Sequence, residues 1–151
     1  MKDHSKNVEE VTEFAKDLTW EKHSTALADQ LYVLGNQNRR QYRLQDQVDW
    51  CITDSPLLLG VQYVTPDYLP VNFKNLLFEL WSTYENHNFF IRRTKPYSPI
   101  GRNQTEQEAR QIDENIIRML TENGVPFSEI LATPDLHQKI FEHIFINTQR
   151  S

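Results

Sequence analysis

The chain has 151 residues, of which 38% are hydrophobic and 25% charged, a composition that suits one soluble domain with a buried core. A formal net charge of −5 argues against a general nucleic-acid binder, and the lack of an 18-residue apolar run argues against a membrane span. A single cysteine, Cys51, excludes an internal disulfide, and the polar N-terminus does not resemble a signal peptide. These features predict a cytoplasmic protein.

Apolar residues follow either a strand or a helix period along most of the chain. Strands are expected at 8–14, 48–54, 89–95 and 127–131. Helices are expected at 24–47, 73–87, 104–124 and 135–146. Ser24 is expected to cap the first helix, and Gly124 is expected to follow the third as its C′ residue. The alternation of strand and helix predicts a three-layer α/β fold, a parallel sheet with helices on both faces.

The apolar run VDWCITD, residues 48–54, ends in a carboxylate. Ligands of parallel sheets bind beyond the carboxyl ends of the strands, where Asp54 is expected to lie. An aspartate there can hold Mg²⁺, which in turn bridges phosphate oxygens. The alternative is structural: Asp54 caps a helix that begins at Pro56, and Pro56 at the first helical position after Ser55 as N-cap fits such a helix too.

Glu13 is expected at the same edge, near the end of the strand at 8–14. A carboxylate in that position can accept a proton from an attacking hydroxyl group, which makes Glu13 a candidate catalytic base. The alternative is an ordinary solvated charge at the end of a strand.

Arginines supply the candidate phosphate-binding residues. Segment 92–110 contains Arg93 and Arg102 among prolines and a glycine, and we expect a lid-like loop that can close over phosphate groups. Arg39 and Arg43 lie one helical turn apart and could hold a second anionic group. Solvated surface charges are the alternative for both sets.

Several common kinds of site are not indicated. The five histidines lack metal-binding spacing, and Cys51 is expected to pack as a structural thiol. A phosphate cradle of the form G-x-x-x-x-G-K-[ST] is absent, because none of the four glycines is followed by lysine.

Four blocks together resemble the P-loop kinase-like ATPases of tailed phages: VEEVTEFAKDLTWE, DQLYVLGNQNRR, VDWCITDSPLLL and IRRTKPYSPIGRNQTEQEARQID. The resemblance extends from residue 6 to about residue 145. It implies that Glu13 is the general-base candidate, that Asp54 is the Walker B-type acid, and that Arg102 and Arg93 are lid arginines. The family's first strand and its glycine-rich loop have no counterpart, so the resemblance implies one truncated domain over 1–151.

In that family the first strand is central, between the strands expected here at 48–54 and 89–95. Its loss would expose strand edges, which a protein partner or self-association would have to cover. Direct pairing of the two flanking strands and a gene start farther upstream are the alternatives.

The resulting hypothesis is a non-catalytic, kinase-derived binding protein, encoded by a phage and acting as an inhibitor of a host defence protein, with no cofactor. The alternative is a phosphotransferase that uses Mg·ATP and acts on a nucleotide, a nucleoside or a nucleic-acid end, with its Walker A segment supplied from upstream or by another chain. Nucleic-acid binding through the arginines is a further, less favoured alternative.

Overall fold

The computed structural model describes residues 6–65, 67–68, 70–94 and 105–147. The chain divides into two compact units, Met1–Tyr84 and Glu85–Ser151. Each unit contains one pair of parallel strands together with its own helices.

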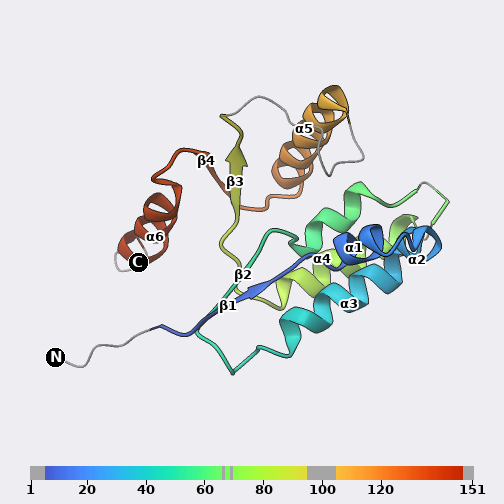
Figure 1. The fold of residues 1–151 in the computed structure, drawn as a ribbon, viewed down its shortest axis with the longest axis horizontal. Helices are drawn as coiled ribbons and strands as arrows, with labels where there is room; N and C mark the ends of the chain where they lie inside the picture. The colour runs from blue at the N-terminus through green and yellow to red at the C-terminus, as the bar shows by residue number, and fades with distance from the viewer. Residues whose placement is uncertain (1–5, 66, 69, 95–104, 148–151) are drawn as a thin grey trace. The chain divides into compact units, whose positions relative to one another are not determined.

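The first unit begins with a strand and continues mainly as helices (Figure 1). Its elements are β1 (Val8–Val11), α1 (Phe14–Trp20), α2 (Ser24–Ala28), α3 (Gln30–Tyr42), β2 (Trp50–Thr53), the 3-10 helix η1 (Leu57–Gln62) and α4 (Pro70–Ser82). The two strands are parallel, in a register that runs from Val8 opposite Trp50 to Val11 opposite Thr53. Their carboxyl ends therefore lie together, at the side from which α1 and η1 continue.

The core of the first unit lies among its helices. There α3 packs against α1 and η1, and α4 packs against η1. The buried apolar side chains of these four elements are Leu18, Leu34, Leu57, Leu58, Phe73 and Leu77. Only the carboxyl end of β1 reaches this core, where Val11 is buried.

The two faces of the β1–β2 pair differ in burial. Residues in register lie on the same face, and successive residues along a strand alternate between faces. One face therefore carries Val11, which is 3% exposed. The other carries Val8 and Ile52, which are 46% and 61% exposed, with the half-buried Trp50 between them. The exposed pair Val8 and Ile52 is called the open face below.

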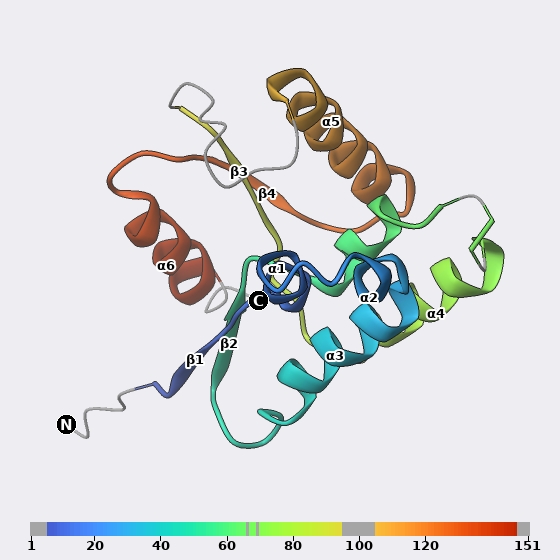
Figure 2. The same ribbon diagram turned by 45° about the vertical axis from the view of Figure 1, so that its right-hand side comes forward.

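The second unit contains β3 (Phe89–Arg92), α5 (Glu106–Glu122), β4 (Ser128–Leu131) and α6 (Leu136–Asn147) (Figure 2). Its strands are also parallel, with Phe89 opposite Ser128. Helix α6 packs on β4, and the His143 ring meets Phe89 edge-on while its Nε2 lies 3.2 Å from Ser128 Oγ. The predicted end of the third helix is confirmed, because Gly124 follows α5 with a positive φ of 64°.

The predicted three-layer parallel sheet is wrong. The described residues form two separate two-stranded parallel sheets, β1–β2 and β3–β4. The hydrophobic pattern identified where strands occur, but each strand is only four residues long, and a pattern does not specify which strands pair. The single truncated domain over 1–151 stays a prediction.

The single helix expected over 24–47 is also wrong. It is broken at Asp29, whose non-helical backbone (φ −80°, ψ 86°) separates α2 from α3. The Asp29 side chain accepts a hydrogen bond from the N–H of Tyr32, so Asp29 caps α3. Ser24 is the first residue of α2, and the capping position before it belongs to His23, which makes no side-chain cap bond.

No helix within the described ranges is both long enough and apolar enough to cross a lipid bilayer.

Candidate functional site

The candidate site lies at the carboxyl ends of β1 and β2. Val11 is opposite Thr53, so the chain leaves both strands at the same level. Asp54 follows β2 directly, and Glu13 stands two residues beyond β1. The strand register therefore brings together the two carboxylates that were predicted to share a site.

The two carboxylates influence each other electrostatically. The pKa of Glu13 is raised above its ordinary value, first by burial and then by the negative charge of Asp54. The nearby Lys16 opposes this shift, and Asp17 adds to it. The result is a half-buried carboxyl group that holds its proton more readily than a solvated glutamate.

A phenol accompanies the carboxylate pair. Tyr63 directly follows η1, and its pKa is raised by burial and by the charge of Glu13. The candidate site thus contains Glu13, Asp54 and Tyr63, which follow the ends of β1, β2 and η1. We call it the Glu13 cluster.

Helix α3 fixes the turn that carries Glu13. The side chain of Gln37, which is 4% exposed, accepts a hydrogen bond from the Phe14 N–H at 2.8 Å. Its amide nitrogen donates to the Thr12 carbonyl at 3.3 Å. The Arg40 guanidinium donates to the carbonyl and hydroxyl oxygens of Thr12 at 3.2 and 2.9 Å. Both neighbours of Glu13 are therefore anchored.

Arg40 makes two further contacts with α1. It forms an ion pair with Asp17, and its guanidinium lies 5.2 Å from the centre of the Phe14 ring. Sequence reasoning selected Arg39 and Arg43, the pair that shares a helix face, instead of Arg40. The structure leaves Arg39 and Arg43 exposed, without an ion pair to any described residue. The sequence feature that could have identified Arg40 is its spacing from Gln37: the two residues lie three apart, on one helix face.

The structural alternative for Asp54 is not found. The residue at the N-cap position of η1 is Pro56, and no side chain caps this helix. Thr53 Oγ1 accepts a hydrogen bond from the Ser55 N–H at 3.1 Å, so the strand-to-helix turn is held by a neighbour of Asp54. The roles of Asp54 and Glu13 in catalysis, and of Asp54 in binding Mg²⁺, stay predictions.

No group of three or more histidine, cysteine, aspartate or glutamate side chains in the described part of the chain is arranged to hold a metal ion. The Glu13 cluster supplies two carboxylates. Further ligands of a bound cation would have to come from water or from another molecule.

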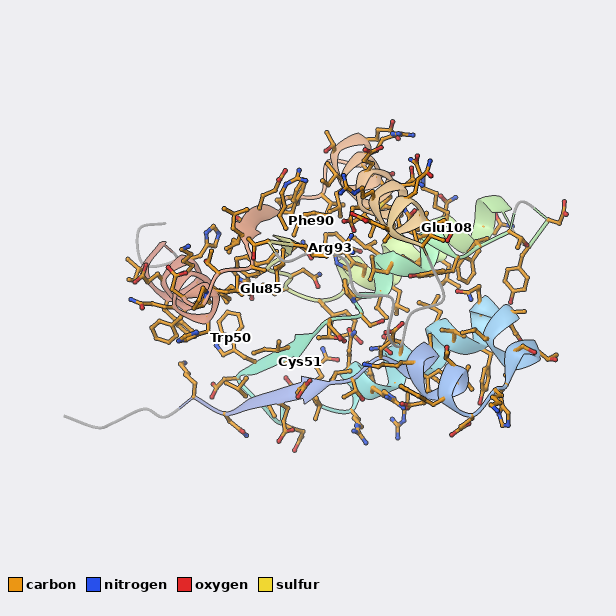
Figure 3. The ribbon with its side chains drawn as sticks, turned by 45° about the horizontal axis from the view of Figure 1, so that its top comes forward. Trp50, Cys51, Glu85, Phe90, Arg93 and Glu108 are labelled. Atoms are coloured by element: carbon orange, nitrogen blue, oxygen red, sulfur yellow. The ribbon has the colours of Figure 1, made fainter. Side chains whose placement is uncertain are left out.

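The predicted lid arginines are only partly described. Arg93, which is labelled in Figure 3, lies just beyond β3 and forms an ion pair with Asp113 of α5. Its neighbour Arg92 pairs with Glu129 of β4 at 2.5 Å. Arg102 and most of the predicted loop at 92–110 lie outside the described residues. Arg92 and Arg93 thus each form an ion pair with a carboxylate on another element of the second unit.

Cys51 was expected to be packed, but it is exposed on β2, next to Trp50 (Figure 3). The thiol is nevertheless partly shielded from water by its neighbours, which raises its pKa. Cys51 therefore carries little thiolate at neutral pH.

Comparison of the chain with protein-family models, curated proteins and solved structures finds no match.

Proposed function

We propose that this chain is a binding protein that acts without catalysis and docks a protein partner on the open face of the β1–β2 pair. One observation carries the proposal: Ile52, in the interior of a parallel strand, is 61% exposed. Parallel strands are normally covered on both faces, whereas here Val11 of one face is buried and Val8 and Ile52 of the other face are exposed. Covering Ile52 would remove apolar surface from water, which favours binding.

The chemistry of the chain supports a role without catalysis. Its sequence contains no glycine-rich phosphate cradle with a following lysine. The described arginines at the start of the predicted lid, Arg92 and Arg93, are engaged in ion pairs. Inhibition of a host defence protein is one form that such binding could take, and it stays a prediction.

Photo-crosslinking tests the docking surface. A photoreactive side chain at position 52 should capture one discrete protein from the native cell extract. The same side chain at position 9, which is exposed on the opposite face of the pair, should not. An unlabelled competitor chain should suppress the adduct, and a competitor carrying Ile52→Lys should not. Equal capture at both positions, or no capture at position 52, would refute the proposal.

A phosphotransferase is the second candidate, and the juxtaposition of Glu13 and Asp54 favours it. In such an enzyme Asp54 would help to hold Mg²⁺, and Glu13 would accept the proton of the attacking hydroxyl group. Calorimetric titration with Mg·ATP distinguishes the two candidates. Non-catalytic binding predicts no saturable heat. Saturable heat that Asp54→Ala abolishes and Glu79→Ala, an exposed substitution on α4, preserves would favour the enzyme.

A further inference from the structure

The outer edge of β1 carries backbone groups that point away from β2. The Trp50 N–H donates to the Asn7 carbonyl at 3.1 Å, so Asn7 faces β2. The N–H and C=O of one residue in a parallel strand point to the same side, and successive residues alternate. Val8 and Glu10 therefore present their backbone groups at the outer edge. Among the described residues, β2 is the only strand paired with β1. Figures 1 and 2 show this pair extending away from the helices of its own unit.

We propose that a second copy of this chain binds the outer edge of β1, strand to strand and antiparallel, with the twofold axis at Val8. Val8 of the two copies would exchange backbone hydrogen bonds, and Lys6 and Glu10 would form the flanking bonded pairs. Such edge pairing satisfies the backbone groups that an edge strand leaves open, and a twofold axis makes the contact self-complementary.

Charge favours this register over shifts of the axis toward the carboxyl end of β1. An axis at Val8 places Lys6 of each copy opposite Glu10 of the other. A shift of the axis to Glu9 or Glu10 would place two carboxylates directly opposite each other. Opposite charges across an antiparallel pair stabilise it, and like charges destabilise it. The sequence Lys6-Asn7-Val8-Glu9-Glu10 thus reads as complementary to itself only about its central residue.

Contacts at both ends of β1 agree with an open edge that runs from Lys6 to Glu10. Beyond Val11, the Thr12 carbonyl is already engaged by Gln37 and Arg40, so the open edge ends there. At the other end, Nζ of Lys6 lies 3.9 Å from Oδ1 of Asp49, and both side chains are about half exposed. A contact this long and this exposed leaves Lys6 able to turn toward a glutamate of the second copy.

The proposal concerns the edge of β1, whereas the proposed function concerns the open face, so either can fail without the other. Val8 belongs to both. Pairing of two copies would join two open faces into one surface across the new four-stranded sheet. The interface is small, which predicts weak and rapidly exchanging dimers.

Charge reversal tests the register. Sedimentation equilibrium over a concentration series should give a monomer–dimer equilibrium for the wild-type chain. Lys6→Glu and Glu10→Lys should each weaken association roughly tenfold or more, because two symmetry-related pairs become repulsive. The double variant should restore it. A chain that stays monomeric at every concentration refutes the proposal, and a double variant no better than the singles refutes this register.

Proline substitution tests the backbone pairing. Val8→Pro removes an outward N–H and should abolish dimers while the urea unfolding of the monomer stays cooperative. Glu9→Pro is the matched control, since it removes an N–H that faces β2 and should destabilise the monomer. Dimers that persist in Val8→Pro would show that the outer edge of β1 is not the interface.

Discussion

The guanidinium of Arg40, on α3, donates hydrogen bonds to both the carbonyl and the hydroxyl oxygen of Thr12, the residue that follows β1. This contact ties the end of a strand to a helix 28 residues away in sequence. Together with Gln37 it anchors the turn on which Glu13 stands. The geometry of the Glu13 cluster therefore depends on α3, which contributes no side chain to the cluster.

Arg40→Ala should lower the free energy of unfolding by roughly 1–3 kcal/mol, because hydrogen bonds to a partly buried charged group are lost together. Arg39→Ala is the matched control, one residue away on the same helix but exposed and without an ion pair to a described residue. It should change stability by at most about 0.5 kcal/mol. Urea titration followed by tryptophan fluorescence measures both. Equal effects of the two substitutions would contradict the anchoring role of Arg40.

The raised pKa of Glu13 predicts a pH-dependent effect of Glu13→Gln. A carboxyl group whose pKa is higher in the folded than in the unfolded chain binds a proton more tightly in the folded chain. Its contribution to stability is therefore most favourable below the ordinary value of 4.5 and declines as the pH rises through the folded-state pKa. At neutral pH, ionised Glu13 is destabilising because it is half-buried and close to Asp54.

Glu13→Gln should therefore raise the midpoint of urea unfolding at pH 7, and this gain should shrink as the pH falls toward 4.5. Asp54→Asn should act in the same direction at pH 7, because it removes the charge that repels Glu13. Paired denaturation series at several pH values measure the difference. A Gln variant that is less stable at pH 7 and equally stable near pH 4.5 would indicate that ionised Glu13 is stabilising.

Local signals in the sequence located much of this arrangement. A polar residue directly after an apolar run placed Asp54 at the end of a strand, and a glycine after a periodic segment placed the end of α5. These signals succeed because strand periods and helix C-caps depend on neighbouring residues only. The joint position of Glu13 and Asp54 followed from the expectation that their strands are parallel, and β1 and β2 are parallel.

Contacts between residues that are distant in sequence could not be predicted from these local patterns. The break between α2 and α3 is held by Tyr68, whose hydroxyl donates to Asp29 at 2.6 Å and accepts from the Leu31 N–H at 3.0 Å. Tyr68 is 39 residues from Asp29, and no local period reveals such a partner. The division into two small sheets has the same origin, because each strand pairs with one that is distant in sequence.

Two glycines of the first unit should respond oppositely to alanine. A Cβ at Gly60 in η1 would lie 2.8 Å from Cδ1 of Leu77, which is fully buried and cannot move aside easily. Gly60→Ala should therefore destabilise the unit by roughly 1–3 kcal/mol through overpacking. A Cβ at Gly35, within α3, meets nothing within 4 Å, so Gly35→Ala should stabilise it by roughly 0.5–1 kcal/mol. Midpoints of urea unfolding measure both effects.

If Gly60→Ala proves neutral, the packing of η1 against α4 is looser than the contact with Leu77 indicates. In that case Leu77→Ala should also have a small effect, whereas a tightly packed leucine should lose roughly 2–5 kcal/mol. The two variants together therefore test the core that supports the Glu13 cluster.

The start of α5 provides the last prediction. Thr105 and Glu108 form a reciprocal capping box: the Thr105 hydroxyl accepts from the Glu108 N–H at 3.2 Å, and the Glu108 carboxylate accepts from the Thr105 N–H at 2.6 Å. The hydrogen bond from the Thr105 N–H is the main cause that lowers the pKa of Glu108. Thr105→Ala removes the hydroxyl and should destabilise the second unit by roughly 0.5–2 kcal/mol.

Thr105→Ser is the matched control, because serine keeps the capping hydroxyl and should retain most of the stability. Amide hydrogen exchange across Glu106–Glu122 locates the effect: protection should fall most in the first turn of α5 in the alanine variant. Loss of protection spread evenly over α5, or an equal loss in the serine variant, would mean that packing along the helix, and not its cap, determines where α5 begins.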